Sequence, residues 1–145
     1  MIITTSRKPS PKIRTFCKNL SRFTGCKYVP RGKTGLEAFP DDNFLLVGEY
    51  KGNPGSFNFF LKGISILSIH ASVSMDKEIG PGQAPVIEGE SKLAQALRKA
   101  TGFKDGKTSE RVIQVDDNIE FIAKEIPYIV LKVLSVRGEG LVRSV

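Results

Sequence analysis

The sequence SPKIRTFCKNLSRFTG, residues 10–25, decides the fold of the first part of the chain. Ser10 is a typical N-cap, Pro11 suits the first helical position, and Gly25 is a typical stop signal, so the stretch predicts a helix of about 13 residues. Its apolar residues recur at the spacing of one helical face: Ile13, Phe16, Cys17, Leu20 and Phe23. We therefore expect this face to pack against a core.

A second stretch, SKLAQALRKATG at residues 91–102, also begins with a serine and ends in Thr-Gly. Strand-like segments accompany both helices: MIITTS, CKYVP, NFLLVGEY, FNFFL and GISILSIHASV lie around the first, and PVIEG, RVIQVDD, IEFIAKE and PYIVLKVLSV around the second. The order strand, helix, several strands thus occurs twice. It predicts a single α/β domain with mixed sheets, residues 1–145, built from two similar half-domains at roughly 1–79 and 84–145.

Some local features are also predicted. TGLEAF (34–39) is typical of a short helix and KGNPG (51–55) of a turn. In GISILSIHASV the apolar positions switch from even to odd numbers, which indicates a bulge or a strand break near Leu67. The run 128–136 is apolar on both faces apart from Lys132 and Ser135. It predicts a central strand that is covered on both sides.

Positive charge is concentrated near the N-terminal end of the chain. The chain has 22 Lys and Arg against 15 Asp and Glu, for a net charge of +7, yet its first acidic residue is Glu37. The basic residues before that point are Arg7, Lys8, Lys12, Arg14, Lys18, Arg22, Lys27, Arg31 and Lys33. We call this set the basic segment. Such a concentration of charge indicates a polyanionic partner.

On the first helix, Arg14, Lys18 and Arg22 stand four residues apart and form a stripe beside the apolar face. Like charges at this spacing disfavour a helix by about 0.2–0.5 kcal/mol per pair, and Lys12 and Arg14 lie at the positive end of the helix dipole. Stability alone would not select this pattern. The free amides of a helix N-terminus favour an anion such as phosphate, so we expect a negative partner to lie on the helix.

The segments IITTSRKPSPKIRTFCKNLSRF and YVPRGKTGLEAF together resemble the N-terminal signature of the Brix domain family, in the compact form typical of archaeal members. APVIEG with its helix, ERVIQVDDNIEFI and IPYIVLKVLSVR resemble the second half of that family, so the resemblance covers essentially the whole chain. It implies an RNA-binding protein of ribosome biogenesis that acts on pre-rRNA or its assembly complexes. It also implies that each half is similar to the anticodon-binding domain of class IIa aminoacyl-tRNA synthetases.

The resemblance implies particular RNA-binding positions as well. The basic signature of the family carries over to Arg7, Lys8, Arg14, Lys18, Arg31 and Lys33. Lys12, Arg22 and Lys27 belong to the same charged stretch, so the whole basic segment is the candidate RNA-binding set. Glu88 and Glu90 depart from the family pattern before the second helix, which leaves an RNA role for the second half open.

Two motifs imitate nucleotide-binding loops. RGKT (31–34) resembles the end of a Walker loop, but Lys27 stands where that loop needs a glycine. GPGQAP (80–85) has Pro85 at the third glycine position of a dinucleotide fingerprint, and a turn is the better interpretation. We therefore expect neither nucleotide hydrolysis nor a dinucleotide cofactor.

No catalytic or metal-binding set is predicted either. His70 is the only histidine, and it has no cysteine or carboxylate at ligand spacing, so a structural or surface role is expected. The pairs Asp41-Asp42 and Asp116-Asp117 lie in turn-like contexts. The two cysteines, Cys17 and Cys26, are expected to be reduced and buried. The sequence thus predicts a non-enzymatic protein without cofactors.

Two further functions stay open: a protein-interaction module with an acidic partner, and an anticodon-domain-like module that binds transfer RNA. Ribosome assembly proteins are additional candidate partners. Phe23 lies on the core face of its helix, which leaves Tyr28 as a candidate for stacking on a base. The sequence has no signal peptide and no apolar run of membrane-spanning length, so we expect a cytoplasmic protein without membrane contacts. Nothing in it demands an oligomer, and we expect a monomer.

Overall fold

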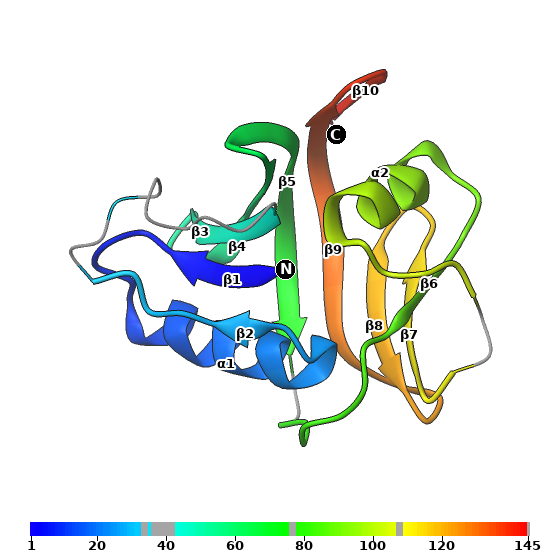
Figure 1. Ribbon diagram of the computed structural model, residues 1–145, viewed down its shortest axis with the longest axis horizontal. Coiled ribbons are helices and arrows are strands. Elements are labelled where there is room, and N and C mark those ends of the chain that lie inside the picture. Colours follow the sequence, from blue (N-terminus) through cyan, green and yellow to red (C-terminus); the bar gives the residue numbers. More distant parts are fainter. Residues whose placement is uncertain (33–34, 36–42, 76–77, 107–108, 145) are drawn as a thin grey trace.

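The computed structural model describes residues 1–32, 35, 43–75, 78–106 and 109–144. The described part forms one ten-stranded mixed sheet with two helices (Figure 1). In chain order the elements are β1 (Ile2–Thr5), α1 (Pro11–Thr24), β2 (Lys27–Tyr28), β3 (Asn43–Tyr50), β4 (Asn53–Leu61), β5 (Ile64–Met75), β6 (Val86–Glu88), α2 (Lys92–Thr101), β7 (Arg111–Val115), β8 (Ile119–Ala123), β9 (Ile126–Gly138) and β10 (Leu141–Ser144).

The sheet repeats one topology twice. β1 runs parallel to β2 and β3, and β3, β4 and β5 then form an antiparallel meander. In the same way β6 runs parallel to β7, which continues antiparallel through β8 and β9. The long strands β5 and β9 pair antiparallel along the middle of the molecule (Figure 1). This pairing joins the two repeats in the order β2-β1-β3-β4-β5-β9-β8-β7-β6, with β10 added to β9.

The two helices are capped alike, as the sequence predicts. Ser10 and Ser91 have extended backbones, and each side chain accepts a hydrogen bond from the backbone N–H three residues later. Gly25 and Gly102 end the helices with φ of 76° and 77°, in the left-handed region that a residue with a Cβ rarely adopts. Local sequence chemistry therefore sets both ends of both helices.

The helices differ in length by one turn. α1 has 14 residues and α2 has 10, and every buried position of α2 matches a buried position of α1 when the two Thr-Gly ends are aligned. The extra turn of α1 therefore lies at its N-terminal end, over Pro11–Arg14. It carries Lys12 and Arg14, for which α2 has no counterpart.

One continuous core holds the repeats together. Phe16 of α1 packs edge-on against Phe57, with ring centroids 5.8 Å apart, and Phe23 packs in the same way on Phe121 of β8 at 5.3 Å. The second contact crosses between the repeats. Phe16 and Phe23 are 2% and 0% exposed, which confirms the predicted core face of the helix.

Two polar contacts also cross between the repeats, in reciprocal fashion. Arg111, the first residue of β7, donates to the carbonyl oxygens of Arg22 and Phe23 at the end of α1, at 2.6 and 2.9 Å. Asn43, the first residue of β3, donates through Nδ2 to the carbonyl oxygen of Ala100 at the end of α2, at 3.1 Å. Each repeat thus supplies the donor for the unpaired carbonyls at the end of the other repeat's helix.

Arg111 further organises the GPGQAP segment. Its guanidinium donates to the carbonyl oxygen of Gly80 at 2.6 Å, and a Cβ on Gly82 would lie 2.4 Å from the guanidinium carbon. The residue at position 82 must therefore be very small. The segment is an irregular structural connection; residues 80–85 contain no turn, so the predicted turn was wrong.

The sequence prediction for strand 128–136 is half right. β9 is central, between β5 and β8, but its side chains alternate: Ile129, Leu131, Val133 and Val136 are buried, whereas Lys132 is exposed. One face of the strand is covered and the other is open to solvent. The prediction of cover on both sides was wrong because Val130 and Leu134 on the open face are only partly buried.

Other local predictions have mixed outcomes. The bulge near Leu67 is confirmed, since Phe59 pairs with Leu67 and Phe60 with Ser65, which leaves Ile66 without a partner on β4. The turn predicted at 51–55 is shorter, because β4 already begins at Asn53. β10 was not predicted. The short helix expected at 34–39 lies outside the described residues apart from residue 35.

Cys17 and Cys26 are free and buried, as predicted. Burial raises the pKa of the Cys17 thiol from 9.0 to about 12. Since the thiolate forms first in the unfolded chain, this group leaves stability unchanged below pH 9 and lowers it as the pH rises from 9 towards 12.

We therefore expect a Cys17→Ala variant to lose less stability between pH 8 and pH 10 than the parent, by about 1.4 kcal/mol. Urea unfolding of both proteins at the two pH values measures this difference. The side-by-side comparison removes the contribution of all other titrating groups. Equal losses in parent and variant would show that Cys17 does not titrate in this way.

Candidate nucleic-acid interface

The described members of the basic segment lie close together along the chain and on the surface. Arg7 and Lys8 are exposed in the loop between β1 and α1, and four more cations are exposed on α1. Lys27 is exposed on the edge strand β2, and Arg31 is half-buried just beyond it. Lys33 lies outside the described residues. The loop and the edge strand lie at the β1–β2 end of the sheet, and α1 runs from there to below β5 and β9 in the middle of the view (Figure 1).

On α1, the stripe Arg14, Lys18 and Arg22 points away from the core. The buried residues of the helix fill the opposite side, and the first turn contains no acidic residue. The positive charges of Lys12 and Arg14 therefore add to the positive end of the helix dipole, and no acidic side chain in the first turn offsets them. The sequence predicted this exposed stripe but placed it beside the apolar face, whereas it lies opposite that face. It creates a positive surface along the whole helix.

The four cations of α1 form no ion pair with the described residues. In the described part of the chain, the ion pairs are Arg98 with Asp105 at 2.8 Å, Lys99 with Glu139 at 4.0 Å, and Lys124 with Glu110 at 3.8 Å. All of these residues belong to the second repeat. The four cations of α1 take part in none of them, so their charge is available to a ligand.

Lys12 has a different neighbour. Its Nζ donates, at 3.4 Å, to Oδ1 of Asn53, the first residue of β4 after the β3–β4 turn. The positive surface therefore reaches this turn, which also contains exposed Lys51. This extension was not predicted, because Lys12 and Asn53 are 41 residues apart and only the fold brings them together.

Tyr28 is a weaker stacking candidate than the sequence suggested. It is half-buried against the core, and its hydroxyl oxygen is enclosed. Burial raises the pKa of Tyr28, with a smaller contribution from Cys17, and the nearby Arg14 guanidinium partly opposes this. A side chain packed in this way has little freedom to receive a base.

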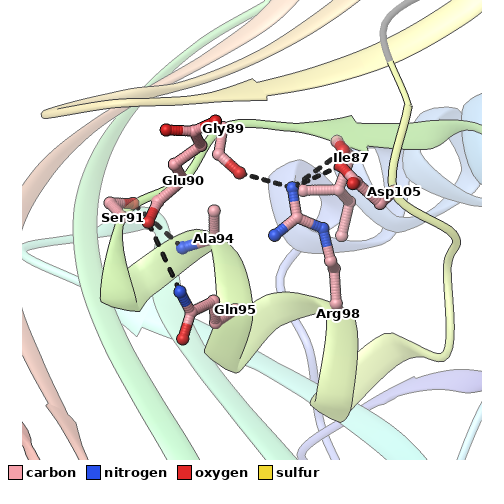
Figure 2. A network of polar contacts seen from close by, with 8 residues as sticks. All are labelled: Ile87, Gly89, Glu90, Ser91, Ala94, Gln95, Arg98 and Asp105. Atoms are coloured by element: carbon pink, nitrogen blue, oxygen red, sulfur yellow. Dashed lines mark hydrogen bonds and ion pairs between the residues drawn. The ribbon is translucent and has the colours of Figure 1, made fainter.

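The second repeat carries a different surface at the corresponding helix. Arg98 of α2 turns back to the strand end, where it donates to the carbonyl oxygens of Ile87 and Gly89 and pairs with Asp105 (Figure 2). Its positive charge is used within the fold. Lys99 likewise faces Glu139.

The N-terminal end of α2 is acidic on one side. A surface hollow there is lined by Ser91 and Lys92 of the helix start and by Asp116 and Asp117 of the β7–β8 turn. Negative charge at this position opposes phosphate binding. Of the two described helices, only that of the first repeat therefore offers a uniformly positive surface.

The remaining motifs have structural explanations where they are described. Oδ1 of Asp116 accepts a hydrogen bond from the backbone N–H of Asn118, which confirms turn chemistry for that aspartate pair. His70 is exposed on β5, as expected. Asp41-Asp42 and the end of RGKT lie outside the described residues.

The described residues form neither a metal-binding cluster nor a membrane-spanning helix. No group of three or more His, Cys, Asp or Glu side chains there could hold a metal ion. Of the helices described, neither has the length and apolar content needed to cross a membrane.

Comparisons with known proteins agree on the family. No protein-family model matches the chain. A probable Brix domain-containing ribosomal biogenesis protein of Methanosarcina mazei is 41% identical to it, over 88% of this chain and 88% of the relative. A protein of the same description from Methanococcoides burtonii is 38% identical, over 84% and 86%.

Solved structures show the same fold. The crystal structure of Mil, an archaeal Imp4-like protein, superimposes with a TM-score of 0.79 at 26% identity, over 95% of this chain and 99% of that one. A probable ribosomal biogenesis protein from Aeropyrum pernix matches with a TM-score of 0.72 at 24% identity, over 91% and 93%, which bears on the fold alone. From the extent and identity of these matches, the chain belongs to the family of Brix domain-containing ribosomal biogenesis proteins.

Proposed function

We propose that the protein binds ribosomal RNA or its precursors during ribosome biogenesis, through the basic segment on α1 and the loop before it. The observation that carries this proposal is the stripe Arg14, Lys18 and Arg22, which faces solvent and forms no ion pair with any described residue. The relatives named above as ribosomal biogenesis proteins supply the biological context.

In this proposal the protein acts as a non-enzymatic assembly factor. Lysine and arginine side chains on α1 neutralise phosphates, and the loop with Arg7 and Lys8 brings two more cations to the helix N-terminus. Phosphate contacts position an RNA without reading its sequence. The protein would therefore hold a strand or a junction of the folding RNA while other assembly proteins act on it, without a cofactor.

The proposal also covers the organisation of the domain. We treat residues 1–145 as one domain whose half-domains, roughly 1–79 and 84–145, are each similar to the anticodon-binding domain of class IIa synthetases. Shared helix caps and shared strand order support this view. The acidic hollow beside α2 supports an RNA role for the first half alone. A monomer in the cytoplasm is part of the same proposal.

The two alternatives predict different behaviour. An acidic protein partner would also meet the positive surface, but would not reproduce the salt dependence of phosphate neutralisation. On single-stranded RNA, each contacted phosphate contributes about −0.7 to the logarithmic salt slope, so six contacts give roughly −4. A transfer-RNA-binding module would share that slope. Crosslinking the protein to RNA in cells and sequencing the bound fragments separates ribosomal from transfer RNA.

We expect the protein to bind ribosomal RNA fragments more tightly than duplex DNA at matched salt. The two described helices lie in different repeats, so they form no helix-turn-helix unit that could enter a DNA major groove. Titrations of labelled rRNA fragments and of a DNA duplex of equal length measure this preference. They are carried out at 0.1 M salt, where the Debye length of about 10 Å still lets exposed charges interact. Equal affinities would contradict it.

A further inference from the structure

The face of the sheet that turns away from the core is open and polar at its centre. Along β5 this face carries Ser68, His70, Ser72 and Ser74, and the last three are exposed. Three of the four have polar partners across the strand pair: Arg137 lies opposite Ser68, Ser135 opposite His70, and Lys132 opposite Ser72. The partner of Ser74 is Val130.

An aromatic pair stands on this open face. The rings of Tyr50 and His70 are stacked, with centroids 4.8 Å apart and planes at 14°. Lys51 Nζ lies 5.5 Å from the centre of the Tyr50 ring, and the Ser135 hydroxyl lies 3.3 Å from Nδ1 of His70. His70 is exposed although its ring is held on two sides. We call Tyr50 and His70 the stacked pair.

Stability does not require this arrangement. A ring that only filled space would be covered by another layer, whereas His70, Ser72 and Ser74 on this face of β5 are exposed. The stacked pair instead presents aromatic surface to solvent beside cations. Aromatic rings on an open sheet face with flanking cations are the usual platform for unpaired bases.

The electrostatics of this face suit an RNA strand. Lys51, Lys132 and Arg137 are exposed and take part in none of the ion pairs of the described chain. The acidic residues to weigh against them are Glu120, half-buried on β8 opposite Val130 on the same face, and Glu49, exposed directly before Tyr50. The cations therefore exceed the acids around the stacked pair, which complements a phosphate backbone.

The stacked pair is also connected to the basic segment. Lys12 of α1 contacts Asn53, the first residue of β4, which follows the turn that contains Lys51. Lys51 in turn lies over the Tyr50 ring. A strand bound along α1 can therefore continue over this turn to the sheet. The corresponding turn of the second repeat is Asp116-Asp117-Asn118, which has the opposite charge.

We propose that the stacked pair Tyr50–His70 is a second RNA-binding site, which receives an unpaired base of a strand whose phosphates lie on α1. The inference rests on the proposed function and deepens it, because it names the RNA form that is bound: a single-stranded segment beside a region held through phosphates. The stacking ring supplies the preference for unpaired bases that phosphate contacts alone cannot give.

The test is a titration of a single-stranded RNA and of a fully paired RNA of equal length with His70→Ala, His70→Tyr and the parent. His70→Ala is expected to weaken binding of the single strand by at least about fivefold and to leave the duplex unaffected. His70→Tyr keeps a ring and should retain the affinity. The salt slope should not change in either variant, because stacking neutralises no phosphate.

Lys51→Ala supplies a second arm with a matched control. Lys51 and Lys124 both occupy hairpin turns with positive φ, of 53° and 50°, but Lys124 pairs with Glu110 at the far end of the sheet. Lys51→Ala should flatten the salt slope by about 0.7, and Lys124→Ala should not. Thermal melts of all variants confirm that each is folded.

The two proposals fail in different ways. If the parent binds RNA and loses affinity on substitution of Arg14 and Lys18, but His70→Ala binds the single strand as tightly as the parent, the stacked pair is not a binding site and the proposed function stands. The stacked pair is equally excluded if His70→Ala weakens binding of the single strand and the duplex to the same extent. If the parent binds neither RNA, both proposals are overturned.

Discussion

Replacing Arg111 by methionine is expected to destabilise the protein by about 3 kcal/mol or more. The side chain is 7% exposed, and its guanidinium supplies donors to the carbonyl oxygens of Arg22, Phe23 and Gly80. Methionine fills much of the same volume but donates nothing. A buried carbonyl left without a donor costs about 1–3 kcal/mol. The hydrogen bond to Phe23 is buried, and those to Arg22 and Gly80 are partly buried, so their loss adds a smaller amount.

The variant should also loosen the join between the repeats. Arg111 comes from β7 of the second repeat, whereas two of its acceptors end α1 in the first. It also lies over the Phe23 ring, with Cζ 5.4 Å from the ring centre. Losing these contacts removes a polar tie and part of the packing around the Phe23 and Phe121 rings together.

Urea unfolding measures this effect. Lys124→Met is the matched control: its side chain is 79% exposed and its pair with Glu110 spans 3.8 Å, so the change should stay within about 0.5 kcal/mol. Asn43→Ala removes the reciprocal but single hydrogen bond and should cost about 1 kcal/mol. An Arg111→Met protein as stable as the Lys124→Met protein would show that the guanidinium does not join the repeats.

The second large effect is expected on RNA binding. Arg14→Ala, Lys18→Ala and Arg22→Ala combined should weaken binding to single-stranded rRNA by about 100-fold at 0.1 M salt and flatten the salt slope by about 2, since each lost phosphate contact accounts for about 0.7. The loss should be similar for different RNA sequences, because these contacts do not read bases. The variant should fold as well as the parent or slightly better, since it removes like-charge pairs at i, i+4.

The control variant loses the same number of positive charges, but from the second repeat. Lys92→Ala, Lys99→Ala and Lys124→Ala combined also remove three positive charges, but from exposed positions in the second repeat. This protein should bind RNA almost as tightly as the parent. Phe16→Ala is a stability control: its ring is 2% exposed, so the change should cost about 3–5 kcal/mol and lower affinity only through unfolding.

Two outcomes would speak against an RNA surface on α1. If the α1 triple variant melts much earlier than the parent yet binds RNA as well when folded, the stripe serves the fold and is not an RNA surface. Equal losses of affinity in both triple variants would indicate that net charge alone drives binding.

Both helices could be predicted from the sequence to within a residue because their signals are local. A serine cap, a periodic apolar face and a glycine in the left-handed region determine each helix without help from the rest of the chain. The repeated order of elements follows from the same signals. The exposure of the α1 cations was predictable too, because the apolar face fixes the opposite side of the helix.

The features that the sequence did not predict depend on distant partners. Arg111 begins a strand and would be expected on the surface, yet its acceptors are 31 to 89 residues away. The open face of β9 could not be recognised because Val130 and Leu134 on it are apolar, and apolar residue types do not show whether a layer covers them. The same holds for the link from Lys12 to Asn53, which places Lys51 and the stacked pair beside the basic segment.

The central claim is that RNA lies on the first repeat. Ultraviolet crosslinking of the protein to an rRNA transcript, followed by mass spectrometry of the crosslinked peptides, locates the RNA directly. We expect crosslinks in peptides that span residues 7–31 and 50–53. Crosslinks confined to α2, β7 and β8 would place the RNA on the second repeat and contradict this claim.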